Sequence, residues 1–351
     1  ERNKQRQFRF SNEKKQIMQR LDLLVIDEIS MVRADMLDAV DAALRRHRRN
    51  NQPFGGVQLL MIGDLHQLSP VAKPDDWQLI QQYYESVYFF SSNALDLTQL
   101  LTIELKHIYR QTDVNFIKLL NHVRDNRLND PTIDALNQRH IPDFTPGKDK
   151  GYITLTTHNR NADSMNQSRL EALSKKAHQF KAQISGDFPE HIYPTPAILR
   201  LKEGAQVMFL RNDPSAERQY YNGKIGRVIK ISDKHISVIC PGDPGRIIVE
   251  PVLWENIKYT LNDENKEIQE DIIGKFEQYP LKLAWAITIH KSQGLTFDKA
   301  IIDAKAAFTH GQVYVALSRC KTLEGMILSS PLSSKGIKTN EAINNFTKIT
   351  R

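Results

Sequence analysis

The sequence predicts an α/β protein with doubly wound parallel sheets, and three observations favour this class. Short apolar runs rich in β-branched residues alternate with stretches of helical periodicity. Several of these runs are uninterrupted, as expected for parallel strands buried on both faces. They also end abruptly at acidic or glycine residues, which is typical of the sheet edge where ligands bind.

A first α/β unit is expected near the N-terminus. The pattern predicts a buried strand at Leu21–Ile26, an amphipathic helix at Ala34–Arg49 and a second strand at Val57–Ile62. A further strand is predicted at Thr98–Ile103. The order of strand, helix and strand with short loops indicates a parallel sheet, because parallel neighbours need a crossover connection.

A second α/β unit follows, and its sequence is interrupted. Its helices are predicted at residues 115–124, 159–173 and 311–319, and its strands at residues 152–156, 283–287, 300–302 and 325–329. Between them, short β-branched runs alternate with Gly and Pro pairs, at residues 206–210, 225–231, 235–239 and 247–252. This pattern predicts a small antiparallel barrel inserted into the second unit.

Composition limits the classes of function. The 351 residues carry 48 Lys and Arg against 41 Asp and Glu, and the net charge of +7 suits a polyanionic partner. No apolar run reaches the roughly 18 residues of a membrane span, so no membrane partner is expected. Two cysteines, Cys240 and Cys320, are too few for a disulfide framework and favour a reducing compartment.

The strand at Leu21–Ile26 stops at two acidic residues, Asp27 and Glu28. At the C-terminal edge of a parallel sheet, Asp27 could hold Mg²⁺ through its water shell. Glu28 could polarise a water molecule that attacks a γ-phosphate. The alternative is an ordinary strand end that meets solvent.

Gln67 lies in a second polar segment, which begins at Gly63 directly after the next apolar strand. Its amide both donates and accepts hydrogen bonds, so it could sense a γ-phosphate. The alternative is a Gly-Asp turn before a loop limited by Pro70. The segment is weak evidence by itself and gains weight from the acidic pair.

Two arginines lie at the edges of the second α/β unit. Arg110 follows Ile108-Tyr109, and Arg319 ends the segment that begins at Val313. A guanidinium group is always charged and binds phosphate oxygens in a bidentate manner. Each could act as an arginine finger, a role worth on the order of 10³–10⁵ in rate. For any single arginine, a surface ion pair is the commoner explanation.

The loop Thr288–Thr296 is dense in hydrogen-bond donors and contains Gly294. Such a loop lets backbone amides approach the phosphates of a nucleotide or of a nucleic acid. The alternative is an ordinary polar loop between two strands.

Taken in order, these segments resemble the superfamily 1 helicases of PIF type (petite integration frequency), with their RecD-like relatives. The resemblance rests on segments in the family's order: Ile26–Met31, Gly63–Val71, Tyr109–Gln111, Gly204–Met208 with Asn222-Gly223, His290–Gly294 and Val313–Arg319. It implies two RecA-like P-loop NTPase-type domains with parallel sheets, the second carrying an inserted small SH3-like β-barrel. It also implies an ATP-dependent DNA helicase that moves along single-stranded DNA from 5′ to 3′ and unwinds duplexes.

The resemblance divides the chain into four ranges. Residues 1–104 would form the C-terminal part of the first RecA-like domain. Residues 105–210 and 281–351 would form the two segments of the second, and residues 211–280 the SH3-like barrel.

The resemblance also assigns the ATP site, with ATP and Mg²⁺ as cofactors. Asp27 matches the Mg²⁺ carboxylate, Glu28 the catalytic base and Gln67 the γ-phosphate sensor. Arg110 and Arg319 match the arginine fingers. The backbone position that faces the nucleotide is Gly294.

The residues that the resemblance turns toward DNA are Thr157, Asn159, His290 and Ser292. The expected partners are single-stranded DNA and forked duplex DNA, in repair or recombination, with the protein acting as a monomer. The expected location is the cytoplasm, near the nucleoid, in a bacterium, and the nucleus or mitochondrion in a eukaryote. His66 and Ser69 depart from the family pattern. This departure affects the expected DNA contact of their loop and leaves the expected ATP chemistry unchanged.

No Gly-x-x-x-x-Gly-Lys-Ser/Thr segment occurs in these 351 residues. In the family this phosphate-binding loop precedes the Asp-Glu strand and cradles the β-phosphate. We therefore expect the chain to be a fragment that binds and hydrolyses ATP poorly by itself, whereas the intact parent is an ATPase.

Two other functions stay open. A metal-dependent nuclease would use Asp27, Glu28 and Asp64 as a carboxylate cluster and would cleave DNA without ATP. That reading leaves both arginine segments and the Thr288–Thr296 loop unexplained. A non-catalytic single-stranded-DNA-binding module would follow if the phosphate-binding loop had been lost in nature.

Overall fold

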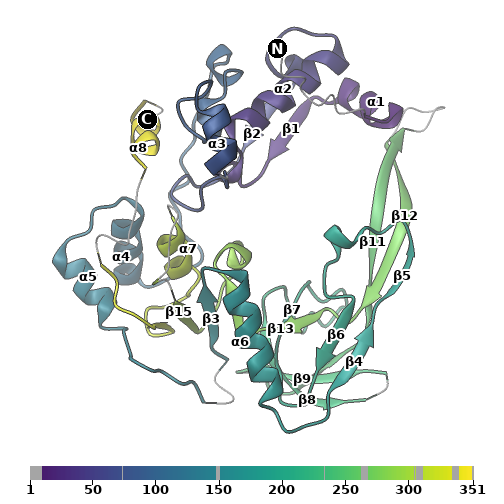
Figure 1. Cartoon of the computed structure of the whole chain (residues 1–351), viewed down its shortest axis with the longest axis vertical. Helices are drawn as coiled ribbons and strands as arrows, with labels where there is room; N and C mark the ends of the chain where they lie inside the picture. The colour runs from purple at the N-terminus through teal and green to yellow at the C-terminus, as the bar shows by residue number, and fades with distance from the viewer. Residues whose placement is uncertain are drawn as a thin grey trace.

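The structure, a computed structural model, describes residues 10–72, 74–147, 151–232, 234–261, 268–303, 305, 311–333 and 340–349. Three parts follow one another in Figure 1: a first lobe (residues 10–97), a second lobe (residues 105–173 and 284–333) and a β-rich insertion (residues 178–283). In the described ranges, no helix is long and apolar enough to cross a membrane. The predicted α/β class with parallel sheets is confirmed.

The first lobe is built on two parallel strands, β1 (Leu23–Ile26) and β2 (Gln58–Met61), joined through helix α2 (Ala34–Arg48). The sequence predicted this order. Leu37 and Leu44 of α2 enter the core of the lobe. The remaining helices of the lobe are α1 (Asn12–Arg20) and α3 (Pro74–Ile80).

The expected burial of both faces of these strands is wrong for β1 and β2 within the described residues. One face packs into the core with α2, but Leu23, Val25 and Leu60 on the other face are 45%, 50% and 47% exposed. An apolar run shows that a strand can be covered on both sides. It does not show that the described residues supply both covering layers.

The predicted strand at Thr98–Ile103 is also wrong. Residues 98–109 form an irregular connection between the lobes, and Leu101 and Leu105 are more than four-fifths exposed. A strand needs a neighbour for its backbone N–H and C=O groups. Among the described residues no strand pairs with this segment, so its β-branched composition does not decide its structure.

The second lobe contains a four-stranded parallel sheet in the order β14-β3-β15-β16. Its strands are β3 (Ile153–Thr156), β14 (Ala286–Thr288), β15 (Ala300–Asp303) and β16 (Met326–Leu328). Its helices are α4 (Val114–Arg124), α5 (Asp130–Asn137), α6 (Asn159–Glu171) and α7 (Gln312–Ser318). All four residues of β3 are buried, as expected for a central parallel strand.

The insertion contains a five-stranded antiparallel sheet in the order β10-β9-β8-β7-β13. Its strands are β7 (Gln206–Phe209), β8 (Ile225–Ile231), β9 (Ile236–Ile239), β10 (Arg246–Val249) and β13 (Leu281–Leu283). The sheet therefore takes in residues on both sides of the expected boundaries at 210 and 280. The run predicted as one strand at residues 283–287 is divided between β13 and β14.

A long hairpin of β11 (Val252–Leu261) and β12 (Ile268–Gln278) extends from the insertion to α1 (Figure 1). There the Lys258 Nζ lies 3.4 Å from Glu13 Oε1. The sequence analysis did not predict this hairpin, nor three further strands: β4 (His178–Lys181), β5 (Gln183–Gly186) and β6 (Ile198–Leu201). β4 pairs with β6, and β5 pairs with β12.

Helix α8 (Glu341–Ile349) returns to the first lobe (Figure 1). The ring of Phe346 stacks on Phe90 with centroids 4.5 Å apart and meets Phe89 edge-on. The first lobe is thus linked to the second by the connection at residues 98–109, contacts the insertion through the hairpin and packs against α8.

One carboxylate of α2, Asp38, organises the C-terminal part of the first lobe. It accepts hydrogen bonds from the Tyr84 hydroxyl and the Ala94 amide, each at 3.0 Å, and from the side chains of Ser92 and Asn93. Burial alone would raise the pKa of Asp38, but these donors outweigh it and hold the pKa below its ordinary value.

We expect Asp38→Ala to destabilise the first lobe by about 2 kcal/mol, because several donors lose their shared acceptor. Denaturant unfolding followed by circular dichroism measures the difference. Asp134→Ala, at an exposed position of α5, is the control. Because the folded pKa of Asp38 is depressed, its contribution is present above the unfolded pKa and disappears as the pH falls through the folded value. An equal effect of both substitutions would contradict this role.

Candidate active site

Asp27 and Glu28 directly follow β1, at the C-terminal edge of the parallel pair β1 and β2, where the predicted site was expected. The two strand ends are held together, since the Ile29 amide donates to the Ile62 carbonyl at 2.9 Å. Glu28 has φ 50° and ψ 43°, a left-handed conformation that is uncommon outside glycine. Its amide donates to Asp27 Oδ1 at 2.9 Å. The turn leaves Asp27 exposed and Glu28 half-buried.

Gln67 follows the end of β2 and lies beside this edge. Its Nε2 donates to Asp64 Oδ2 at 3.2 Å, and the His66 amide donates to Asp64 Oδ1 at 3.0 Å. Gly311 of the second lobe packs on the Gln67 loop with φ 77°, and a Cβ at that position would collide with the Gln67 carbonyl oxygen. The two lobes therefore touch at the predicted sensor.

Arg319, at the end of α7, is 1% exposed and is among the largest fully buried side chains. Its Nε donates to the Val315 carbonyl at 3.0 Å, and its Nη2 donates to the Ser318 hydroxyl at 2.9 Å. Burial and the nearby charge of Arg110 lower the pKa of Arg319 to about 10, while Glu28 acts in the opposite direction. The structure thus places Arg319 near both Arg110 and Glu28.

Arg110, at the start of the second lobe, lies near Arg319 and Glu28. Burial lowers the pKa of Arg110, and the charge of Glu28 partly opposes this effect. Neither Arg110 nor Arg319 forms an ion pair within 4 Å among the residues that the structure describes. Two cations that repel each other face the acidic edge, an arrangement that suits an anion with its metal between them.

Gln111 was quoted with its neighbours in the sequence but received no role. Its Nε2 donates to the Ser318 and Cys320 carbonyls, both at 2.9 Å, on either side of Arg319. The residue after one arginine therefore fixes the backbone around the other. This link between distant segments leaves no signal in the sequence beyond the adjacency of Gln111 to Arg110.

Three other residues of the site were missed. Gln293 Nε2 donates to Glu28 Oε2 at 2.8 Å across the lobes. Tyr314 forms a hydrogen bond with Asp64, and burial together with that carboxylate raises the pKa of Tyr314. Arg124 of α4 interacts electrostatically with both Tyr314 and Asp64 while pairing with Asp125 at 2.9 Å. Gln293 and Tyr314 lie within the quoted segments, so only their roles were undetected.

The residues expected near the nucleotide backbone or DNA differ in accessibility. Gly294 is exposed, has φ 77°, and a Cβ there would meet no atom within 4 Å. Asn159 is exposed at the start of α6, and His290 is half-buried, which lowers its pKa. The hydroxyls of Thr157 and Ser292 are turned to internal partners, His158 Nδ1 at 2.7 Å and the Ile289 carbonyl at 2.7 Å.

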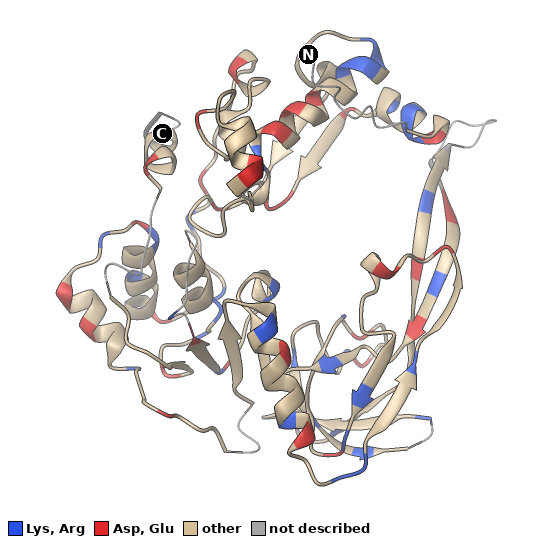
Figure 2. Ribbon diagram, in the orientation of Figure 1, with Lys and Arg blue, Asp and Glu red and all other residues tan. Residues whose placement is uncertain are grey.

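A cleft of about 790 Å³ lies beside α6, between the second lobe and the insertion. It is lined by Asn159, Thr288 and Lys291, and by Lys282 and Arg200 of the insertion. Two acidic side chains, Asp163 and Glu190, also line it. Figure 2 shows basic residues on the neighbouring strands β4 and β6, whereas α6 carries both basic and acidic residues.

Lys282 and Lys291 are neighbours in this cleft. Burial and the charge of Lys291 lower the pKa of Lys282 to about 8. Within the described part of the chain neither ammonium group has a hydrogen-bonded or ion-pair partner. Unpaired neighbouring lysines in a concave surface suit a phosphate-bearing ligand.

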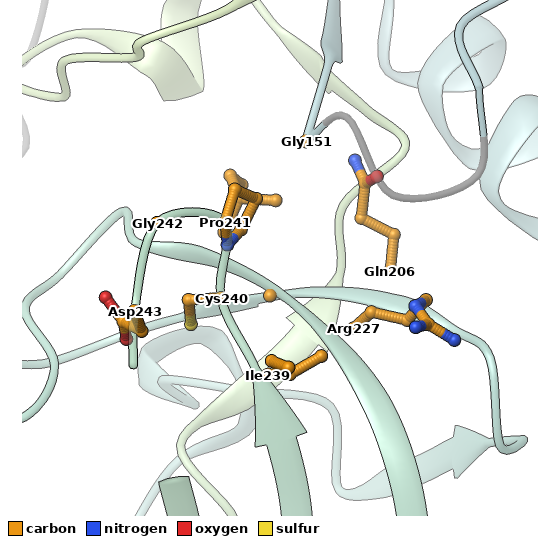
Figure 3. A pocket seen from close by; sticks show the side chains of 10 residues that line it. Gly151, Gln206, Arg227, Ile239, Cys240, Pro241, Gly242 and Asp243 are labelled. Atoms are coloured by element: carbon orange, nitrogen blue, oxygen red, sulfur yellow. The ribbon is translucent and has the colours of Figure 1, made fainter. Parts of the chain in front are cut away.

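A second cavity, of about 300 Å³, lies at the border of the insertion (Figure 3). Cys240 lines it, and burial raises the pKa of this thiol to about 11, so the thiol stays protonated near neutral pH. Gln206 at its edge donates to the Tyr152 and Ala284 carbonyls at 2.7 and 2.8 Å. No predicted site residue lines this cavity, which separates it from the candidate site.

The carboxylates of the site offer hard oxygen ligands. The described residues contain no group of three or more His, Cys, Asp or Glu side chains arranged to hold a metal ion. Mg²⁺ is commonly held by one or two carboxylates, waters and substrate phosphates, so the exposed Asp27 fits such an ion. Asp64, in contrast, is already bonded to Gln67 and Tyr314.

Comparison with known proteins shows the family to which the chain belongs. Residues 2–134 match the model of the PIF1-like helicase family. The chain is 35% identical over 313 residues to the human "ATP-dependent DNA helicase PIF1". The aligned region covers 86% of this chain and 45% of the human protein. The chain thus spans less than half the length of that relative.

Two solved structures are similar along almost the whole chain. Bacteroides sp Pif1 in complex with ADP-AlF4 is 38% identical with a TM-score of 0.90, over 99% of this chain and 79% of that chain. Bacteroides Pif1 bound to ssDNA is 38% identical with a TM-score of 0.67, over 97% and 78% of the two chains. On this identity and coverage, the chain belongs to the PIF1-like helicase family.

Proposed function

We propose that the whole protein to which these residues belong is an ATP-dependent DNA helicase that hydrolyses ATP between the two lobes. The observation that carries the proposal is the meeting of Asp27 and Glu28 with two arginines that have no ion-pair partner among the described residues. Membership of the family supports the same conclusion. A triphosphate supplies the anion that these arginines lack.

The side chains divide the chemistry between the lobes. Glu28 accepts a proton from the attacking water, and Gln67 contacts the γ-phosphate. Arg110 and Arg319 stabilise the negative charge that develops on the phosphate oxygens. Asp27 holds Mg²⁺, which when bound neutralises phosphate charge and orients the triphosphate.

Single-stranded DNA is proposed to occupy the cleft beside α6. Asn159 and Lys291 line it at the second lobe, and Lys282 and Arg200 line it at the insertion. His290 lies in the same turn as Lys291, so the DNA cleft and the ATP site share one loop. Thr157 and Ser292 support this surface from inside, since their hydroxyls have internal partners.

The finer expectations rest on the family resemblance. They are travel from 5′ to 3′, forked duplexes as substrates, action as a monomer and a role in repair or recombination. The solved structure of Bacteroides Pif1 bound to ssDNA supports DNA as the track.

The two alternatives make different demands on the site. A nuclease would use Asp64 as a metal ligand, but both oxygens of that carboxylate accept hydrogen bonds. A binding module would have no use for the buried Arg319, which has no ion-pair partner among the described residues and costs stability unless an anion binds near it.

We expect Glu28→Gln in the whole protein to lower DNA-stimulated ATP turnover at least 100-fold, because the amide cannot accept the proton. Binding of ATP and of single-stranded DNA should change less than about twofold. Steady-state ATPase and fluorescence anisotropy measure both quantities, and unwinding of 5′-tailed against 3′-tailed duplexes gives the polarity.

The 351 residues alone are the natural control, because they contain no phosphate-binding loop. Slow hydrolysis by this chain is expected. Vigorous DNA-stimulated hydrolysis by it would contradict the proposed need for that loop, and equal loss of ATP affinity and turnover in Glu28→Gln would contradict the role of Glu28.

We expect Lys282→Gln to weaken binding of a fluorescent oligothymidylate to the chain about three- to tenfold and to reduce the slope of log K against log salt by about 0.7. Wild-type affinity should also fall as the pH rises through about 8, because only protonated Lys282 attracts phosphate. The neighbouring charges are Lys291, Arg200, Asp163 and Glu190.

Lys118→Gln, at an exposed position of α4, is the matched control for this measurement. Anisotropy titrations at several salt concentrations and pH values give the affinities. If both substitutions lower the salt slope equally, the cleft beside α6 is not the DNA-binding surface.

A further inference from the structure

Gln293 of the second lobe contacts two proposed site residues of the first lobe. It belongs to the second lobe, directly after the turn at His290–Ser292. Its Nε2 lies 2.8 Å from Glu28 Oε2 and 3.5 Å from Gln67 Oε1, both on the first lobe. One amide group therefore reaches two residues of the proposed hydrolytic centre.

The orientation of this amide is set by its neighbours. Glu28 and Gln67 both present acceptor oxygens, so only the NH₂ end of Gln293 can face them. The opposite end, Oε1, is buried and has no hydrogen-bond partner among the described residues. A buried acceptor without a partner is unusual in a side chain that serves packing alone.

The contact also restricts Glu28 itself. Because the Glu28 backbone is left-handed and its amide is bonded to Asp27, the remaining freedom of the residue lies in its side chain. The bond to Gln293 fixes one carboxylate oxygen and leaves the other available. That fixed position exists only while the second lobe lies against the first.

We propose that Gln293 is a positioning residue that aligns Glu28 and Gln67 for hydrolysis when the lobes are together. The inference rests on the proposed function. In this role, Gln293 makes turnover depend on contact between the lobes. Gln293 also directly follows the turn that borders the DNA cleft. Gln293 acts through Glu28 and Gln67.

A charge exchange tests the contact in the 351-residue chain without any need for catalysis. Gln293→Glu places two carboxylates against each other and should lower the unfolding midpoint by roughly 2–4 °C. Adding Glu28→Gln restores a carboxylate–amide pair and should recover the midpoint. If the double variant is no more stable than expected from the two single variants added together, the bond between the lobes is not formed.

Kinetics of the whole protein test the positioning role. Gln293→Met keeps the length of the side chain and removes the donor, so kcat for DNA-stimulated hydrolysis should fall about tenfold, with KM for ATP changed less than twofold. Gln138→Met, at the exposed end of α5, is the control and should match the wild type. An unchanged kcat, or a rise in KM alone, would overturn the role.

The two measurements separate the two proposals. A wild type without ATPase would overturn the proposed function and with it the catalytic meaning of the bond. An active wild type with no recovery in the charge exchange would overturn the inference about Gln293 and leave the proposed function standing.

Discussion

The constraint on which this site depends is electrostatic and lies between the lobes. Arg319 is buried, Arg110 is close enough to lower its pKa, and neither has an ion-pair partner among the described residues. Two neighbouring guanidinium groups repel each other when no anion lies between them. The carboxylates of Asp27 and Glu28 stand opposite. In the proposed function, a triphosphate with Mg²⁺ would complement the charges of both sides.

Neutral amide side chains organise these charges. Gln111 holds the carbonyl groups on both sides of Arg319, while Gln67 bonds Asp64 and Gln293 reaches Glu28. Amide groups suit this role because they donate and accept hydrogen bonds without adding charge to a site that already contains several ions. Gln111 thereby fixes the backbone around Arg319 without adding a charge that would pair with its guanidinium group.

The geometry also suggests how ATP and DNA communicate. The turn at His290–Ser292 borders the cleft beside α6, and the next residue, Gln293, contacts Glu28, the proposed catalytic base. A DNA strand bound against Lys291 would therefore act on the segment that contains Gln293, the residue proposed to position Glu28. Short covalent connections of this kind couple two sites without a long chain of intermediate contacts.

The sequence by itself determined the local elements and the family. Apolar runs that stop at an acidic residue or at glycine predicted β1 and β2, helical periodicity predicted α2, and the ordered motifs identified the family and proposed Asp27, Glu28, Gln67, Arg110 and Arg319 as candidate site residues. These features depend on neighbours within a few residues, which a sequence displays directly. The strand expected at Thr98–Ile103 failed because apolar composition cannot supply a pairing partner.

Only the tertiary structure decided which distant groups meet. The bonds from Gln111 to Ser318 and Cys320, and from Gln293 to Glu28, span more than 200 residues and have no periodicity that a sequence could reveal. The same holds for burial: Ser292 and Asn159 are both polar, yet one hydroxyl is turned inward and the other side chain faces solvent. Contact and burial arise from packing of the whole chain, and packing is a property of three dimensions.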